Sequence, residues 1–147
     1  MKSDKLNLYL EYLDEVFQRL ARRLHAELAQ NMVGGITMSQ FIVLKTIKAK
    51  GKITVSEVAE DLSVSLSAIT ALADRLFRVG FVKRQRDEQD RRLVWLTLTG
   101  EGEKMVSLCQ AARRKVTEKY FSSLQEEDIE QLIKIYEKVL NFIKQES

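Results

Sequence analysis

The sequence predicts a mainly α-helical fold that carries one small β-hairpin, and three observations lead to this prediction. Apolar residues recur at alternating steps of four and three near both ends of the chain, the spacing of helices that pack lengthwise on other helices. Between them, two segments rich in β-branched and aromatic residues flank a charged loop. The chain has no proline, and its six glycines separate these segments.

The totals describe one domain of ordinary size. The chain has 147 residues, of which 45% are hydrophobic, and this is enough to bury a core. It has no run of about 18 apolar residues, and its first residues lack the features of a signal peptide, so we expect a cytoplasmic protein that does not enter a membrane. The single cysteine, Cys109, cannot form an internal disulfide, which agrees with a reducing compartment.

The basic residues are concentrated in the middle of the chain. The formal net charge of +3 is too small to indicate a polyanionic partner by itself. The distribution is more informative, because residues 122–147 carry more acidic than basic side chains. The basic residues between positions 75 and 92 are Arg75, Arg78, Lys83, Arg84, Arg86, Arg91 and Arg92.

A long first helix is predicted between Leu6 and Leu28, before the first pair of glycines. Its apolar seam consists of Leu6, Leu10, Leu13, Phe17, Leu20 and Leu24. A second helix is expected to begin after Thr37, because Gln40 three residues later completes a capping box. This helix is expected to stop near Gly51.

Two short helices joined by a tight turn are predicted next. Thr54, with Glu57 three residues later, predicts the start of a short helix that ends at Leu62. After a break, a second helical pattern ends at Val79, and Gly80 takes the left-handed position that closes many helices.

The segments 81–86 and 93–98 predict the two strands of a β-hairpin. Thr99 is expected to cap a long helix, and Ser123 with Glu126 is expected to form the capping box of a last helix. The buried side of the first of these helices is expected to carry Met105, Leu108, Cys109, Ala112 and Val116. The seam of the last helix consists of Ile129, Ile133, Tyr136, Leu140 and Ile143. The seams at both ends of the chain are longer than the small central unit can cover.

The two short helices have the features of a helix-turn-helix. Such a unit needs a small residue where the helices cross, which Ala59 supplies, and apolar residues that hold the pair at a fixed angle. These apolar residues are Val58, Leu62, Val64, Ile69 and Leu72. The second helix starts with short side chains, so nothing bulky keeps its positive N-terminal end out of a DNA major groove. The short side chains are Ser65, Ser67, Ala68 and Thr70.

The most specific motif of the chain is DRRLVWLTLTGEG, which follows LADRLFRVGFVKR. It combines an Asp-Arg-Arg tip, a Leu-Thr strand end and a glycine-containing helix start. In this combination and spacing the chain resembles the MarR (multiple antibiotic resistance regulator) family of winged helix-turn-helix transcription factors, and the resemblance covers essentially its whole length. One departure is Ser63, where many helix-turn-helix turns place glycine.

The resemblance implies a mainly α winged helix-turn-helix fold with a small β-hairpin wing. Residues 1–32 and 101–147 would be dimerisation helices and residues 33–100 the DNA-binding region. It also implies an obligate homodimer that reads a pseudo-palindromic operator in double-stranded DNA, usually as a repressor, with possible release by a small aromatic or phenolic ligand. The residues expected to face DNA are Ser65, Ser67, Ala68, Thr70 and Arg75 on the recognition helix, and Arg86, Arg91 and Arg92 on the wing. Arg91 or Arg92 would enter the minor groove, because the negative potential of narrow A·T-rich DNA attracts arginine.

The acids among the wing arginines are expected to orient them. Asp90 is predicted to pair either with Arg92 in the wing or with Arg75 on the recognition helix, since charge-assisted pairing restricts an arginine to one orientation. Asp87 and Glu88 need only be solvated. The three acids lack the spacing and the glycine of a calcium loop, so no metal site is predicted.

Each of these functional interpretations has a simpler structural alternative. The charged loop alone is compatible with a solvated hairpin tip, and the serines and threonine of the recognition helix with simple helix capping. His25, with Phe17 on the same helix, is either part of a ligand pocket or a surface or interface side chain. Cys109 is expected to be a small buried residue rather than a redox sensor.

No arrangement of residues in the sequence indicates catalysis. With one histidine, one cysteine, no glycine-rich phosphate loop and no metal-ligand cluster, the usual catalytic sites are hard to assemble, so neither an enzyme nor a cofactor is expected. A protein-interaction module that uses the winged unit without DNA remains the alternative. Such a module would still bind its partner after neutralisation of Arg91 and Arg92, whereas a DNA-binding protein would no longer bind its operator.

Overall fold

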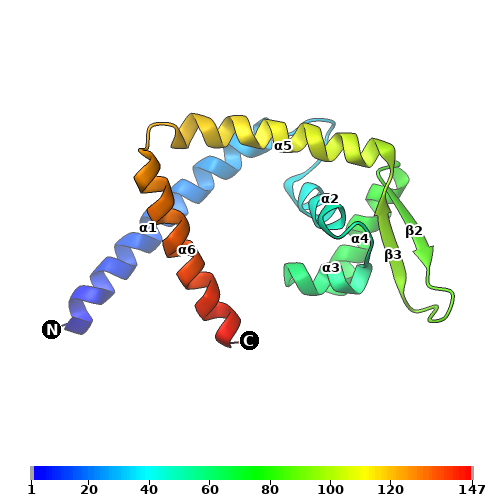
Figure 1. The fold of residues 1–147 in the computed structure, drawn as a ribbon, viewed down its shortest axis with the longest axis horizontal. Coiled ribbons are helices and arrows are strands. Elements are labelled where there is room, and N and C mark those ends of the chain that lie inside the picture. Colours follow the sequence, from blue (N-terminus) through cyan, green and yellow to red (C-terminus); the bar gives the residue numbers. More distant parts are fainter. Residues whose placement is uncertain (1, 147) are drawn as a thin grey trace. The chain divides into compact units, whose positions relative to one another are not determined.

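The computed structural model describes residues 2–146 and has the predicted mainly helical fold with one small antiparallel sheet (Figure 1). The elements follow the order α1, α2, β1, α3, α4, β2, β3, α5, α6. The chain forms two compact units, of which the first ends at Arg113 and the second begins at Arg114, so α5 (Gly100–Phe121) begins in one and ends in the other. Over residues 2–146, no helix is long and apolar enough to cross a membrane.

α1 (Lys2–Gln30) is the long first helix that the apolar seam predicts. None of its residues is buried in the single chain. Its exposed large apolar residues are Leu6, Leu8, Tyr9, Leu10, Tyr12, Leu13, Val16, Phe17 and Leu20. An apolar surface of this extent on a helix is unfavourable in water and usually marks an interaction site.

α2 (Met38–Lys50) begins with the predicted capping box. The hydroxyl of Thr37 accepts a hydrogen bond from the Gln40 amide at 3.2 Å, and the Gln40 side chain accepts one from the Thr37 amide at 3.0 Å. The helix ends at Gly51, which has a positive φ of 76°. Its buried residues are Phe41, Val43, Leu44 and Ile47.

The turn of the helix-turn-helix depends on Ser63. The two helices are α3 (Val55–Leu62) and α4 (Leu66–Arg78). Ser63 has φ 53° and ψ 43°, the left-handed conformation that glycine adopts most easily. Its amide donates to Glu60 O at 3.1 Å, and the Val64 amide donates to Ala59 O at 3.0 Å, the bond pattern of a Schellman helix end. The turn therefore has the backbone of a glycine turn although serine occupies it.

The C-terminal end of α4 repeats this geometry with a glycine. Gly80 has a φ of 85°, its amide donates to Phe77 O at 3.1 Å, and the Phe81 amide donates to Leu76 O at 3.0 Å. The prediction that Gly80 closes the recognition helix is confirmed. The chain turns directly from this end into the first strand of the hairpin.

The predicted hairpin is present, and a third strand that the sequence pattern does not predict joins it. β2 (Val82–Arg86) pairs antiparallel with β3 (Val94–Leu98) along its whole length. β1 (Ile53–Thr54) pairs with the other edge of β3, so the strand order is β1-β3-β2. A strand of two residues is too short to show alternation. Thr54 also caps α3 as predicted, because its hydroxyl accepts the Glu57 amide at 3.1 Å.

The core of the first unit lies between α2, α3, α4, the sheet and the first half of α5. Its largest fully buried side chains are Phe41, Leu44, Ile47, Ile53, Ile69, Leu76, Leu96, Val43, Val58, Val82, Val106 and Cys109. α4 contributes Ile69, Ala73 and Leu76 from a single face. The opposite face of α4 is thereby left open to solvent.

The start of α5 is fixed against the end of α4. The hydroxyl of Thr99 donates to Gly80 O at 2.6 Å and accepts the Gly102 amide at 3.0 Å, so Thr99 caps α5 as predicted. The Thr99 amide donates to Phe81 O at 3.1 Å. A Cβ atom at Gly102 would collide with the same Phe81 carbonyl oxygen, so this close approach requires glycine.

Two residues expected to be buried are exposed instead. Leu108 is 55% exposed, because the buried stripe of α5 runs through Val106, Cys109 and Val116 and places Leu108 on another side of the helix. Val64 is 43% exposed, because it lies in the turn after the left-handed Ser63 and not on a helix face.

The predicted capping box of the last helix is wrong. α6 (Glu126–Glu146) begins at Glu126, so Ser123 lies in the turn two positions before the residue that precedes the helix. That residue, Gln125, donates its backbone N–H to the Asp128 carboxylate at 3.3 Å.

The exposed large apolar residues of α6 are Ile129, Ile133, Ile135, Tyr136, Val139, Leu140, Phe142 and Ile143. Like α1, α6 has no buried residue among those described.

The Ser63→Gly variant is expected to be more stable than the natural chain by about 0.5–1 kcal/mol. A left-handed conformation costs an L-residue about 1–2 kcal/mol. Glycine avoids this cost, but its greater conformational freedom in the unfolded state offsets part of the gain. The free energy of unfolding from urea titrations measures the difference. Ser63→Val is the matched control and should be less stable, since β-branched residues tolerate this conformation worst. A loss of stability in Ser63→Gly would contradict the role given to this turn.

Candidate nucleic-acid interface

The first turn of α4 presents short polar side chains, as the sequence predicts. Ser65 precedes the helix, and its hydroxyl accepts the Ala68 amide at 3.2 Å and lies 3.3 Å from the Ser67 hydroxyl. The Thr70 hydroxyl donates to Leu66 O at 2.8 Å. Ser65, Ser67 and Thr70 are exposed, whereas Ala68 is half-buried and is the least accessible of the four predicted residues. Ser65 therefore caps the helix, and the hydroxyl oxygens of this turn remain accessible as acceptors.

The solvent-exposed face of α4 includes more residues than the sequence predicts. Arg75 is exposed in the last turn, and Ala71 lies between Ser67 and Arg75 at steps of four. Ala71 and the exposed Arg78 are interface candidates that the sequence reading missed. The helical period alone identifies Ala71, since residues four apart share a face.

Arg84 ties the hairpin to the recognition helix. Its guanidinium lies 3.2 Å from the Asp74 carboxylate and stacks over the Phe77 ring at 4.0 Å from the centroid. Asp74 also pairs with Arg78 at 2.9 Å. One carboxylate on α4 thus holds an arginine from β2 and one from its own helix. The Arg84–Asp74 pair joins residues ten apart in sequence, and the charge pattern did not indicate it.

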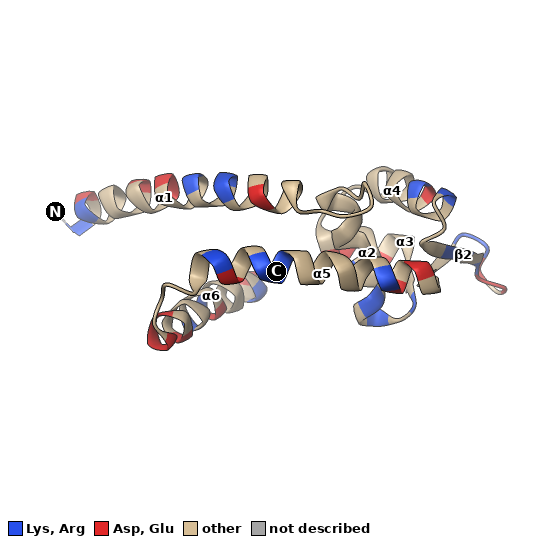
Figure 2. Ribbon diagram, turned by 90° about the horizontal axis from the view of Figure 1, so that it is seen from above, with Lys and Arg blue, Asp and Glu red and all other residues tan. Residues whose placement is uncertain are grey.

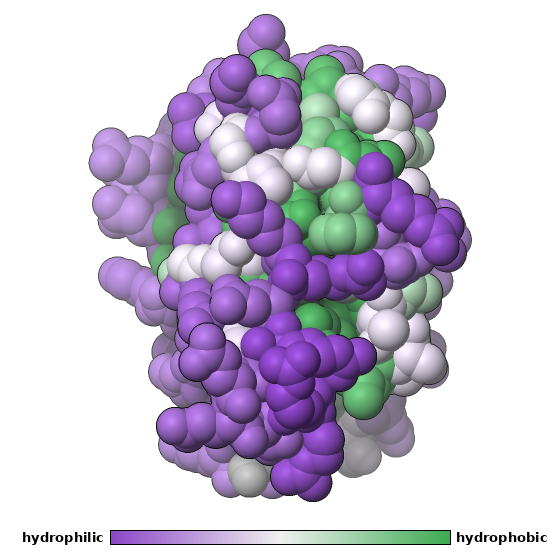
Figure 3. All heavy atoms as spheres, turned by 90° about the vertical axis from the view of Figure 1, so that its right-hand side faces the viewer, coloured by the Kyte–Doolittle hydropathy of each residue, from purple (hydrophilic) through white to green (hydrophobic). Residues whose placement is uncertain are grey.

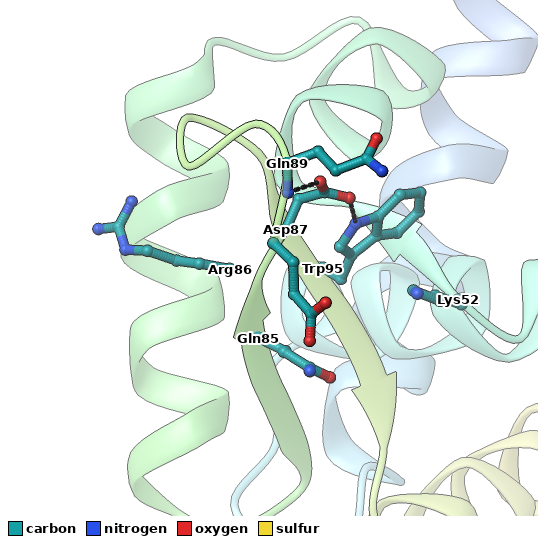
Figure 4. Close-up of a pocket in the computed structure, with 7 residues that line it drawn as sticks. Lys52, Gln85, Arg86, Asp87, Gln89 and Trp95 are labelled. Carbon is teal, nitrogen blue, oxygen red and sulfur yellow. Dashed lines mark hydrogen bonds between the residues drawn. The ribbon is translucent and has the colours of Figure 1, made fainter.

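Asp87 organises the turn of the hairpin, so the expectation that it need only be solvated is wrong. Its Oδ1 accepts the Asp90 amide at 3.0 Å. The same oxygen accepts the Gln89 amide at 2.9 Å, and Oδ2 accepts the indole N–H of Trp95 at 3.0 Å (Figure 4). The Asp90 amide first, then the Trp95 indole and the Gln89 amide, hold the pKa of the Asp87 carboxyl below its usual value. Glu88 is exposed in the same turn.

Asp90 pairs with Arg92, one of its two candidate partners. Oδ1 accepts the Arg92 Nε–H at 3.0 Å and the Arg92 amide at 3.1 Å, and Oδ2 accepts Nη2–H at 3.2 Å. The bonds from the Arg92 side chain, followed by the bond from its amide, lower the pKa of the Asp90 carboxyl. The Arg92 side chain is 90% exposed despite this pairing. Its guanidinium is therefore held in one direction while facing solvent.

The other two predicted wing arginines differ from each other. Arg86 donates from Nη1 to Arg91 O at 2.8 Å and so supports the backbone of the turn. The side chain of Arg91 is exposed and has no hydrogen bond or ion pair with any other described residue.

Lys and Arg positions gather at the end of α4 and along the hairpin, with acidic positions at the tip of the hairpin (Figure 2). The surface on this side of the molecule is largely hydrophilic (Figure 3).

The predicted ligand-pocket residues are not brought together. His25 lines a surface pocket with a volume of about 390 Å³, beside Met32, Ile36 and Met38. Phe17 lies eight residues earlier on α1, is exposed and does not line this pocket.

Cys109 is fully buried in the core, and this burial raises the pKa of its thiol. A raised thiol pKa disfavours the reactive thiolate. Across residues 2–146, no group of three or more His, Cys, Asp and Glu side chains is arranged to hold a metal ion.

Comparison with known proteins gives concordant results. The model of the MarR family matches residues 36–94. The HTH-type transcriptional repressor MdtR of Bacillus subtilis is 35% identical over 123 residues, which cover 83% of this chain and 79% of MdtR. The crystal structure of YusO from Bacillus subtilis matches with a TM-score of 0.70 and 32% identity, covering 92% of this chain and 96% of YusO. A mutant of MarR from E. coli complexed with operator DNA matches with a TM-score of 0.79 and 27% identity, covering 90% and 96%.

The emission of Trp95, the only tryptophan, is expected to titrate with a midpoint below pH 3.8 while the helices stay folded. The bonds to Asp87 lower its pKa in the folded state, so they stabilise the turn above the unfolded value of 3.8 and are lost as pH falls through the folded pKa. Fluorescence reports the indole, and circular dichroism checks the helices.

Asp87→Asn should lack this transition, because the titrating group is gone. Asp90→Asn is the matched control and should keep it, since the Asp90 carboxylate bonds to Arg92 and not to the indole. A transition of the same size and midpoint in Asp87→Asn would refute the assignment.

Proposed function

The chain belongs to the MarR family, and from this membership we propose that it acts as a homodimeric transcriptional repressor on a pseudo-palindromic operator. It is a DNA-binding transcriptional regulator of that family, and its relatives are regulators and not enzymes. The observation that carries the proposal is the open polar face of α4 beside a hairpin whose tip presents an oriented arginine, Arg92. The relative MdtR is named a repressor, which supports repression as the outcome of binding.

α4 enters the major groove with its N-terminal half. The exposed Ser67 and Thr70 offer hydroxyl oxygens, and Ala71 offers a methyl group, to the edges of the bases. The positive N-terminal end of the helix favours an approach to phosphate. Arg75, one helical turn beyond Ala71 on the same face, contacts the sugar-phosphate backbone.

The wing reaches the adjacent minor groove, with Arg92 as the residue that enters it. Asp90 holds the Arg92 guanidinium in one direction, so less conformational entropy is lost when DNA binds. Arg91, whose side chain is exposed, contacts phosphate, and Arg86 supports the turn. Narrow A·T-rich minor grooves have the negative potential that suits such an arginine.

Dimerisation covers the apolar faces of the terminal helices. Residues 1–32 and 101–147 form the dimerisation region, and residues 33–100 form the winged region that reads DNA. The apolar surfaces of α1 and α6 support this division, because all their described residues lie outside the core of the single chain. A second copy of the chain supplies an identical surface, which a two-fold axis makes self-complementary.

Release by a small aromatic or phenolic molecule completes the proposed cycle, which takes place in the cytoplasm. The pocket beside His25 is lined by apolar and hydroxyl side chains near the start of α2 and is the site that we assign to such a ligand. A bound ligand that changes the spacing of the two recognition helices lowers the affinity for half-sites one DNA turn apart. Phe17 is not part of this pocket and belongs to the dimerisation surface instead.

Selection of bound sequences from random duplex DNA tests the proposed function. We expect a two-fold symmetric motif with half-sites about one helical turn, roughly 10 base pairs, apart. The affinity for that motif should fall steeply with salt, since phosphate contacts release counterions. A motif without symmetry, or an affinity that is independent of salt, would overturn the dimeric reader.

The wing assignments predict three different effects on operator affinity. Arg92→Ala should weaken binding about tenfold and reduce the preference for A·T pairs at the flank, because it removes the groove contact. Arg91→Ala should weaken binding to all sequences alike and lower the salt slope by about one. Asp90→Ala should weaken binding by about threefold or more, because Arg92 loses its fixed direction.

Glu88→Ala is the matched control for the loss of a negative charge in the same turn. If only net charge mattered, both Asp90→Ala and Glu88→Ala would bind operator more tightly than the natural chain. Weaker binding in Asp90→Ala alone supports the orienting role, and tighter binding in both variants excludes it. Fluorescence anisotropy at several salt concentrations measures all four variants.

A further inference from the structure

Trp95 occupies the centre of the small sheet. It lies on β3, opposite Thr54 of β1 on one side and Gln85 of β2 on the other. The amine of Lys52 lies 4.5 Å from the centroid of its ring, while its indole N–H bonds to Asp87 at 3.0 Å. Figure 4 shows these groups on one side of the hairpin, with Arg86 pointing away from them. A single side chain thus contacts the segment before β1 and the turn of the wing.

Apart from the bond that Arg86 of β2 donates to Arg91 O at 2.8 Å, the turn of the wing has little other connection to the sheet. Regular pairing of β2 with β3 ends at Arg86 and Val94. Beyond it, the Asp87 amide donates to Leu93 O at 2.9 Å, and the Leu93 amide donates to Asp90 O at 3.0 Å, so these bonds remain within the turn. A two-stranded ribbon twists readily and is only marginally stable by itself. The direction of the wing tip therefore needs a contact that reaches back to the sheet.

The geometry points to Trp95 as the positioning residue of the wing, and we propose that Lys52, Trp95 and Asp87 form a latch that fixes the direction of the wing tip. Lys52 lies against the face of the indole, the indole N–H holds the Asp87 carboxylate, and that carboxylate holds two amides of the turn. The latch touches no base or phosphate. This inference rests on the proposed function, because a fixed direction matters only if the wing tip reaches DNA.

The chemistry of tryptophan is what the latch requires. Its ring is half-buried, so phenylalanine would retain most of the packing but would lose the N–H donor. The hydrogen bond to the Asp87 carboxylate is charge-assisted and stronger than a neutral one. Loss of the donor would release Asp87 from the sheet while leaving its bonds within the turn. The tip would then sample several directions, and binding would have to select one of them.

A double-mutant cycle between Trp95→Phe and Arg92→Ala tests the latch on the operator obtained by selection. Trp95→Phe alone should weaken binding about tenfold, the low end of the loss expected for one hydrogen bond to a charged group. In the Arg92→Ala background the same change should have a much smaller effect, because Arg92 is the main DNA contact that the latch directs. Lys52→Met should weaken binding less, by about twofold.

Gln85→Ala is the matched control. Gln85 pairs with Trp95 across the sheet and lines a surface pocket together with the three latch residues, but it is no part of the latch. It should leave affinity unchanged. Urea denaturation and circular dichroism establish that each variant is folded.

The outcomes separate the latch from the proposed function. Equal weakening by Trp95→Phe with and without Arg92 overturns the latch and indicates a general structural role. Full affinity in Trp95→Phe, with Arg92→Ala still weakened, also overturns the latch but leaves the wing contact standing. An Arg92→Ala protein that binds as tightly as the natural chain overturns the wing contact itself, and the latch with it.

Discussion

The position of α4 is the constraint on which the rest of the structure depends, and left-handed residues at both ends set it. Ser63 turns the chain into α4, and Gly80 turns it out again toward the hairpin. Between them, one face of the helix is buried and the other is open. The hairpin and the start of α5 then follow from the end of α4, because Thr99 bonds to Gly80 and Gly102 approaches the backbone of Phe81. The recognition surface is thereby a consequence of backbone geometry and core packing.

Acidic residues on α4 and in the wing are unexpected in a protein that binds a polyanion, and their contacts explain them. Carboxylates near phosphate are unfavourable unless they have another task. Asp74 holds Arg84 against the recognition helix, Asp87 gathers N–H groups of the turn and of Trp95, and Asp90 directs Arg92. Each carboxylate reduces the electrostatic attraction between the protein and DNA, but it restricts a flexible group to one geometry. The exposed Arg92 shows the balance most clearly, since its charge still faces solvent.

The terminal helices obey a different physical rule from the winged region. In the winged region apolar residues are buried within the single chain, whereas those of α1 and α6 are exposed. The same hydrophobic effect acts on both sets of residues, but the fold of a single chain buries only the apolar residues of the winged region. Under the proposed function, assembly and DNA recognition therefore belong to different parts of the sequence.

The sequence by itself determined the helices, the hairpin and the residues at the first turn of α4, because these depend on local periodicity and on capping groups three residues apart. Thr37 with Gln40, and Gly80 at the end of α4, are clear examples. Local signals also misled at Ser123, which lies before the start of α6, and at Leu108, which lies outside the buried stripe of α5.

Only the tertiary structure decided which charged groups pair and what Trp95 does. Arg84 meets Asp74 across ten residues, and the indole of Trp95 meets Asp87 across eight, through a sheet whose third strand has only two residues. Asp90 had two candidate partners in the sequence and bonds to Arg92 in the fold. Such contacts depend on the register of strands and the direction of side chains, and these follow from the packing of the whole winged unit.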